Sequence, residues 1–447
     1  MVGLEKGSQQ GTVMALVDRY RCPEQYASFD IACDSTGAPD LDELGSDFAA
    51  PTAVHELGYD PSLWIDTLRS ERYLERQARN GARENVKKVV RKAYYLSRPL
   101  MPVSIRKHLQ KLHLRGWEEI KFPSWPVDFT VDRIIESLLK TSLKTRGLTE
   151  IPFIWFWPEG HGACAIMTHD VETESGRDFC GDLMDINDNR KIKSSFQIVP
   201  EKRYAVPAQF REGIKARGFE VNVHDLNHDG HLFRDHKTFT TRAPRINHYA
   251  REFDAVGFRS AVLYRNPDWL KELTFSYDMS FPNVAHLDPQ RGGCCTVMPF
   301  FIGKILELPL TATQDYSLFN VLNDYSLDLW KRQIALILEK HGLISFIVHP
   351  DYIIEKRARE VYEDLLDYLV ELRAQENLWI ALPKEVDGWW RQRSQMKLVH
   401  RDGSWQIEGA GKDRARIAYA HLDGERLVYS IASRTDAAAI DISTQRN

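Results

Sequence analysis

From Ile151 onward, short apolar segments alternate with longer amphipathic segments, and this alternation restricts the fold more than any other feature of the chain. Parallel strands need crossover connections of a dozen or more residues, usually helices, so the alternation predicts an α/β protein with a mainly parallel sheet. Segments with strand character are found at 163–167, 195–199, 219–223, 256–258, 275–277, 305–309, 343–348 and 378–382. Segments with helical periodicity are found between them at 178–192, 207–217, 242–254, 327–340 and 356–375. About seven or eight units in roughly 240 residues favour a closed or slightly open barrel over a doubly wound sheet.

The regions on either side of the alternation have different patterns. Apolar residues recur at helical spacing in three segments of the N-terminal third, at 72–94, 105–112 and 131–143. After Trp390, short extended segments are separated by two Asp-Gly pairs, a signal for hairpins. We therefore predict a mainly helical region over 1–150, a barrel of about seven strands over 151–390, and a small antiparallel β appendage with its tail over 391–447.

The charge of the chain is nearly balanced overall but unevenly distributed. A formal net charge of −4, from 59 Lys and Arg against 63 Asp and Glu, gives no indication of a nucleic-acid partner. Residues 1–68 have a net charge of −9, whereas residues 69–116 have a net charge of +11. The basic stretch fits a solvated helix face neutralised by the acidic one, and it also fits a peripheral contact with a membrane or a lipid-linked saccharide.

The cellular compartment is predicted from segments that the sequence lacks. No uninterrupted apolar run reaches the roughly 18 residues of a membrane span, and the first residues do not form a basic leader followed by an apolar stretch. Six cysteines without a Cys-x-x-Cys pair are too few for a disulfide framework in a chain of 447 residues. These features predict a cytoplasmic protein with reduced thiols.

The first apolar strand of the barrel region is followed by acidic residues. It ends in Thr168-His169-Asp170, and Glu172 follows two residues later. In an extended chain, residues two apart lie on the same face, so one carboxylate can hold a cation while the other works beside it. Functional groups of parallel α/β barrels collect at the carboxyl ends of the strands, where this pair is expected.

Two histidines follow the third strand of the barrel region. His224 and His228 are four residues apart where the strand becomes a loop or helical turn, and this spacing lets both rings converge on one metal. Glu172 follows a strand that is a near neighbour in a barrel, and it would add one carboxylate to the two imidazoles. That ligand set suits a divalent ion with an open position for water, and zinc is the favoured ion.

Three further residues are candidates for roles beside such a metal. Asp170 is left over as a candidate base, and Arg259, after the next strand, could supply the cation that keeps its carboxylate ionised. His349 follows the strand at 343–348 and could protonate a leaving amine. Asp278, in Ser276-Tyr-Asp-Met-Ser280, could hold that imidazole in one tautomer.

The order of these motifs along the chain is characteristic. Asp-x-Glu, His-x-x-x-His, Phe-Arg, Tyr-Asp-x-Ser and a strand ending in His-Pro follow one another, and this order resembles the NodB-type polysaccharide deacetylases. The resemblance covers roughly 151–383 and implies a distorted (β/α) barrel with metal-dependent carbohydrate deacetylase activity. It implies Glu172, His224 and His228 as metal ligands. It also implies catalytic roles for Asp170 as base, Arg259 as partner of the base, His349 as acid and Asp278 as the residue that tunes this acid.

The sequence departs from the family pattern at two places. Val171 separates the two carboxylates, which are adjacent in the family, and Glu172 replaces the usual aspartate ligand. The family segment Arg-x-Pro-Tyr-Gly is replaced by Arg259-Ser-Ala-Val-Leu, so Tyr264 is our candidate for substrate binding there. We predict a hydrolase that removes an N-acetyl group from a saccharide or a saccharide-containing precursor. Two alternatives remain open: hydrolysis of a non-sugar amide or ureide at the same site, and a catalytically silent barrel that binds saccharide.

Overall fold

The computed structural model describes residues 8–32, 61–74, 114 and 116–432 of the chain. Its largest element is a nine-stranded sheet. In spatial order, the strands along its path are β11 (Leu343–Ile347), β4 (Ala163–Val171), β5 (Ser195–Ile198), β6 (Glu220–His224), β7 (Gly257–Arg259), β8 (Tyr277–Asp278), β10 (Ile305–Glu307) and β9 (Phe300–Ile302). The ninth strand, β12 (Leu378–Ala381), pairs with the first half of β4. All pairs are parallel except the one between β9 and β10, so the predicted α/β architecture is confirmed.

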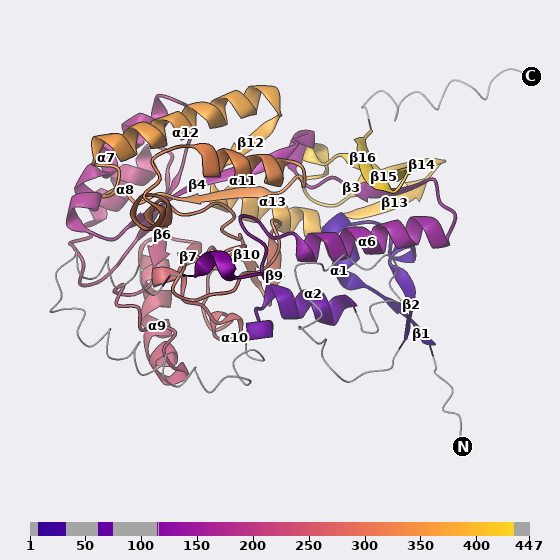
Figure 1. Cartoon of the computed structure of the whole chain (residues 1–447), viewed down its shortest axis with the longest axis horizontal. Helices are drawn as coiled ribbons and strands as arrows, with labels where there is room; N and C mark the ends of the chain where they lie inside the picture. The colour runs from indigo at the N-terminus through magenta and orange to yellow at the C-terminus, as the bar shows by residue number, and fades with distance from the viewer. Residues whose placement is uncertain (1–7, 33–60, 75–113, 115, 433–447) are drawn as a thin grey trace, which may run out of the picture.

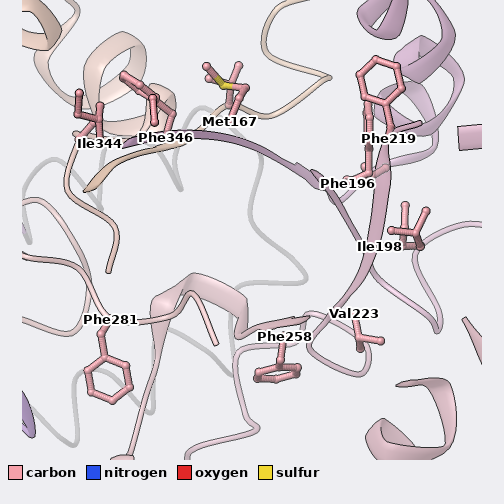
Figure 2. Packing of buried hydrophobic residues seen from close by; sticks show 14 of the residues in the cluster. Met167, Phe196, Ile198, Phe219, Val223, Phe258, Phe281, Ile344 and Phe346 are labelled. Atoms are coloured by element: carbon pink, nitrogen blue, oxygen red, sulfur yellow. The ribbon is translucent and has the colours of Figure 1, made fainter. Parts of the chain in front are cut away.

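The sheet is curled, and the chain after β10 brings its ends together. Beyond β10, the amide of Leu310 donates to the carbonyl of Phe281, and the amide of Ala312 donates to the carbonyl of Ser345 in β11. Figure 2 shows the strands in an arc, with apolar side chains such as Met167 and Phe196 on its outer side. The helices cover this apolar outer surface, because an amphipathic helix must bury its apolar stripe against another element. The sheet is therefore the distorted barrel that the alternation and the family resemblance predict.

The helices of the barrel begin where local capping allows. They are α7 (Glu174–Asp188), α8 (Ala208–Ala216), α9 (His236–Glu252), α10 (Pro267–Leu270), α11 (Asp328–Leu338), α12 (Lys356–Gln375) and α13 (Pro383–Gln395). Helix α9 begins six residues before the predicted start at Arg242, because the Asp235 side chain accepts a hydrogen bond from the amide of Thr238 at 2.8 Å. Such a cap satisfies a helix amide that has no partner within the helix. A π-helical segment, η8 (Tyr316–Leu322), was not predicted.

The two ends of the described chain share a second core. The N-terminal elements are the hairpin of β1 (Ser8–Thr12) and β2 (Ser28–Ala32) and the helices α1 (Met14–Tyr20), α2 (Pro61–Arg69) and α6 (Thr130–Thr145). The C-terminal strands are β13 (Lys397–Arg401), β14 (Ser404–Glu408), β15 (Ile417–Asp423) and β16 (Arg426–Ile431). β15 pairs with β3 (Glu150–Ile154), and Tyr20, Ile135, Phe153 and Ala418 are buried in one apolar cluster. Figure 1 shows these elements together, opposite α7 and α8.

Of the three helices predicted in the N-terminal third, the structure tests only the last. The predicted helix at 131–143 is confirmed as part of α6. The helix predicted at 105–112, almost all of the one predicted at 72–94 and most of the basic stretch 69–116 lie outside the described residues. The division at residues 150 and 390 stays a prediction. Among the described helices, none combines the length and apolar character that crossing a membrane requires.

Gly257 allows β7 to pack closely against β8. A Cβ atom at this position would lie 2.3 Å from the Tyr277 ring, whose hydroxyl accepts from Asn222 at 2.7 Å and donates to Glu220. We expect Gly257→Ala to lower the free energy of unfolding by about 1–3 kcal/mol, because the ring can move only by giving up these buried hydrogen bonds. Urea unfolding measures the change.

The control for this substitution is Gly213→Ala in α8, where an added Cβ has no atom within 4 Å. Alanine is a better helix former than glycine by about 1 kcal/mol, so this variant should be as stable as the wild type or more stable. Equal stability of both variants would show that the space beside Tyr277 is not limiting.

Candidate functional site

Three predicted ligand side chains converge at the carboxyl ends of β4 and β6. Glu172 follows β4 directly, His224 is the last residue of β6, and His228 lies in the loop after β6. Oε1 of Glu172 lies 2.8 Å from Nε2 of His228 and 3.6 Å from Nε2 of His224. One ligand atom from each of the three residues lies within 4.8 Å of the other two. Asp225 and His228, both in the loop after β6, adopt left-handed backbone angles.

The two imidazoles are oriented as metal ligands would be. Nδ1 of His224 lies 3.1 Å from the carbonyl oxygen of Arg259, and donation of its proton there leaves the Nε2 lone pair facing Glu172. Nε2 of both rings is buried near Oε1 of Glu172 without a well-aligned hydrogen bond, and Nδ1 of His228 is buried without a partner among the described residues. Buried polar atoms without partners are rare, and two nitrogens with one carboxylate oxygen suit a divalent ion such as Zn²⁺. The side chains present therefore fit a metal.

Asp170 lies beside this group and is held by the predicted arginine. Nη1 of Arg259 donates to Oδ1 of Asp170 at 3.0 Å and to the Thr168 hydroxyl at 2.8 Å, and all three side chains are buried. Nε of Arg259 donates to the carbonyl oxygen of Met279 at 3.0 Å, which fixes the plane of the guanidinium. Burial raises the pKa of Asp170, but Arg259 and the neighbouring histidines more than offset burial, so the pKa lies below its usual value. The carboxylate is therefore ionised at neutral pH.

His349 also lies beside Glu172, two residues after the end of β11. Its Nε2 is 3.3 Å from Oε1 of Glu172, and its ring packs against Tyr352 with centroids 4.7 Å apart. Nδ1 lies 2.7 Å from Oδ1 of Asp315, and the backbone amide of His349 donates to Oδ2 of Asp315 at 2.7 Å. Burial lowers the pKa of His349, yet Asp315 and Glu172 raise it well above its ordinary value. The imidazolium form is thus favoured at neutral pH.

The prediction that Asp278 holds His349 is wrong, because Asp315 occupies that position. Asp278 lies in β8, and its carboxylate accepts from the Ser280 hydroxyl at 2.7 Å. Asp315 was missed because it follows the irregular chain after β10, outside any predicted strand. That chain bonds to β11 through Ala312, which carries Asp315 to the end of the strand that precedes His349.

Glu307 is a second acid that sequence reasoning missed. It is fully buried in β10 opposite Asp278, and its Oε1 accepts from the amide of Phe281 at 3.1 Å. Burial, together with the charge of Asp278, raises the pKa of Glu307 well above its ordinary value. The neutral form of this buried side chain is therefore favoured more than in an ordinary glutamic acid. No sequence signal identifies this residue, because a single acid in an apolar strand can equally be a solvent-exposed residue at the edge of a sheet.

Tyr264 follows the short helix η7 (Ala261–Leu263) in the loop after β7 and is partly exposed. Its predicted contact with substrate stays a prediction. Val262 and Leu263 both have positive φ, which is unusual for a β-branched residue such as Val262 and indicates a strained loop. Nε of Arg265 donates to Oε2 of Glu71 at 2.7 Å in a buried ion pair. The N-terminal region thus fixes the end of this loop.

Comparisons with known proteins give low similarities. No protein-family model matches the chain, and no curated protein matches it. A Mycobacterium smegmatis structure assigned to the polysaccharide deacetylases is 17% identical, with a TM-score of 0.44, over 56% of this chain and 98% of that one. The Puue allantoinase is 11% identical, with a TM-score of 0.39, over 53% of this chain and 92% of that one. A mutant of the peptidoglycan deacetylase PdaC from Bacillus subtilis is 10% identical, with a TM-score of 0.34, over 53% and 94% of the two chains.

Polysaccharide deacetylases are thus among the solved structures to which this chain is similar. At these identities, the motifs of the chain and the measured geometry of its site remain the basis for any statement about function. The chain has the curled, mainly parallel β/α sheet and the grouped Asp, Glu and His side chains that its resemblance to the NodB-type deacetylases implies.

Proposed function

We propose that this chain is a metal-dependent hydrolase that removes an N-acetyl group from a saccharide or a saccharide-containing precursor. The observation that supports this proposal most is the convergence of Glu172, His224 and His228, with buried imidazole nitrogens that lack well-aligned hydrogen bonds among the described residues. Asp170, held by Arg259, and His349, held by Asp315, both lie beside this group. The motif order of the NodB-type deacetylases supports the same chemistry.

Glu172, His224 and His228 are the residues that would hold the ion. Two nitrogen donors and one carboxylate leave a coordination position open, which is typical of catalytic rather than structural zinc sites. When bound, such an ion acts as a Lewis acid toward an amide carbonyl and a water molecule. Nδ1 of His224 donates to a backbone carbonyl, and this contact fixes the ring orientation that metal binding requires.

Asp170 and His349 would move the protons of the hydrolysis. Asp170 is ionised, and its Oδ2 lies 3.6 Å from Nε2 of His224, which supports the proposed role of accepting the proton of the attacking water. His349 holds a proton at neutral pH, and its Nε2 faces Glu172 because Nδ1 is engaged by Asp315. In this proposal, it gives this proton to the departing amine. The base and the acid are therefore separate groups with opposite protonation states.

The direct test is to measure bound metal and released acetate. The purified protein, loaded with Zn²⁺, should release acetate from N-acetylated chitooligosaccharides or from N-acetylglucosamine derivatives, whereas their deacetylated counterparts should release none. Metal binding with cleavage only of non-sugar amides or ureides would overturn the saccharide substrate. Absence of both metal binding and amide cleavage would overturn the enzyme and favour a saccharide-binding barrel.

Asp315 offers a smaller test of the same mechanism. We expect Asp315→Asn to reduce kcat about 10- to 100-fold with little change in KM, because the amide cannot stabilise the imidazolium of His349. Steady-state kinetics of acetate release measure both constants. Asp328→Asn, an exposed aspartate in the first turn of α11, is the control and should retain full activity. An unchanged kcat in Asp315→Asn would exclude a role for this carboxylate in positioning the acid.

A further inference from the structure

A cavity of about 370 Å³ lies where the N-terminal helices meet the barrel. It is formed by α1, α2, the chain around β9, and α13, and none of the candidate site residues lines it. Figure 1 shows α1 and α2 beside β9, far along the sheet from β4 and β5. Its volume falls in the range of about 300–1,000 Å³ that is usual for small-molecule sites.

The mouth of this cavity exposes large apolar side chains. Met14, Leu63 and Phe301, which are 49%, 40% and 40% exposed, all line it. Half of the large apolar side chains that the described part of the chain exposes are therefore gathered at one place. Single exposed apolar residues are normal, but a group of them around a cavity indicates a binding surface.

Arg69 adds a positive charge to the lining of the cavity. Its guanidinium lies over the Phe300 ring, 5.3 Å from the centroid, and its Nε is buried without a hydrogen-bond partner among the described residues. It also makes no ion pair with any described residue, whereas the other arginine of the lining, Arg19, is bound to Asp132 at 3.0 Å. Burial and the nearby charge of Arg19 lower the pKa of Arg69. Arg69 is partly exposed, and its buried Nε without a hydrogen-bond partner would be satisfied by an anionic acceptor.

We propose that this cavity binds a monoanionic amphiphile, that is, a small molecule with one acidic head group and an apolar body. The head group pairs with the guanidinium of Arg69, and the apolar body covers Met14, Leu63 and Phe301. Asp18 and Asp66 also line the cavity, and their repulsion disfavours a ligand with two or more negative charges. This site is independent of the function proposed for the barrel.

Decanoate is the probe, and decanol is its uncharged counterpart. We expect titration calorimetry to show saturable decanoate binding to the full chain and weaker binding of decanol. Arg69→Met should weaken decanoate binding about tenfold or more, the effect of losing a charged hydrogen bond, and should leave decanol binding unchanged. Arg251→Met, an exposed arginine of α9, is the matched control and should bind decanoate like the wild type.

Two further measurements keep the test decisive. Leu63→Glu places a negative charge at an exposed position of the mouth, so it should weaken decanoate binding without unfolding the protein, even if Arg69→Met fails to fold. Absence of saturable decanoate binding, or equal binding by wild type, Arg69→Met and Leu63→Glu, would overturn the proposal. The wild type is also sedimented with vesicles of equal parts phosphatidylcholine and phosphatidylglycerol. If it binds these vesicles but not decanoate, and Arg69→Met does not bind them, the ligand would be a lipid surface and the proposal of a free amphiphile would be overturned.

Discussion

His224→Ala is expected to lose both the bound divalent ion and the amide hydrolysis, with a fall in turnover of about a thousandfold or more. His224 is buried at the end of β6, and its Nε2 is one of only three ligand atoms in the group with Glu172 and His228. With two ligands remaining, the ion would be weakly held, and its Lewis acidity would be lost to the reaction. Metal content per protein and acetate release, measured on the same preparation, test both parts of this prediction.

The control for this variant is His236→Ala. His236 is exposed at the start of α9, where it contacts Glu272 and not the candidate site. It should retain the ion and the full rate, and circular dichroism should show both variants folded. A His224→Ala protein with normal metal content and full hydrolytic rate would refute the assignment of the metal centre.

The second large effect is expected from Asp170→Asn, which should retain the ion but lose about a hundredfold to ten-thousandfold in turnover. The amide has nearly the shape of the carboxylate but cannot accept a proton from water. The contact with Arg259 changes from an ion pair to a hydrogen bond, so the side chain should stay in place. Metal content that equals the wild type while kcat falls is the result that separates a base from a ligand.

Asp182→Asn, an exposed aspartate of α7, is the matched control and should leave both metal content and kcat unchanged. Loss of metal in Asp170→Asn would instead assign this carboxylate to the ligand set, in line with the second group of close side chains, which joins Asp170 to Glu172 and His349. Full activity in this variant would exclude Asp170 as the base.

Much of the barrel could be predicted from periodicity, because buried parallel strands are short apolar runs and their crossover helices are amphipathic. β4, β5, β6 and β11 all lie where such runs occur. β9 was missed because it is three residues long and pairs antiparallel with β10. The pairing of β15 with β3 was also missed, since it joins segments more than 250 residues apart.

The side chains of the candidate site divide in the same way. Glu172, His224 and His228 were found because each lies at the end of a strand or in the loop after it, and neighbouring strands of a parallel sheet bring such residues to one edge. Asp315 was not found, because the chain between β10 and η8 is irregular and no periodicity shows which strand it adjoins. Asp315, and not Asp278, is the partner of His349 because it lies close to this ring in space, which the sequence does not show.

By itself, the sequence determined the order of strands and helices, the acidic and imidazole side chains available at the strand ends, and the spacing of the metal-binding pattern. Only the tertiary structure decided that Asp315 holds His349, that Glu307 lies buried next to Asp278 with a raised pKa, and that Arg69 lacks an ion-pair partner among the described residues. The physical reason is that periodicity reports the side of one element that faces the core. Which charges lie within hydrogen-bonding distance depends on how the sheet curls and on where irregular connections pass, and these are set by packing between distant segments.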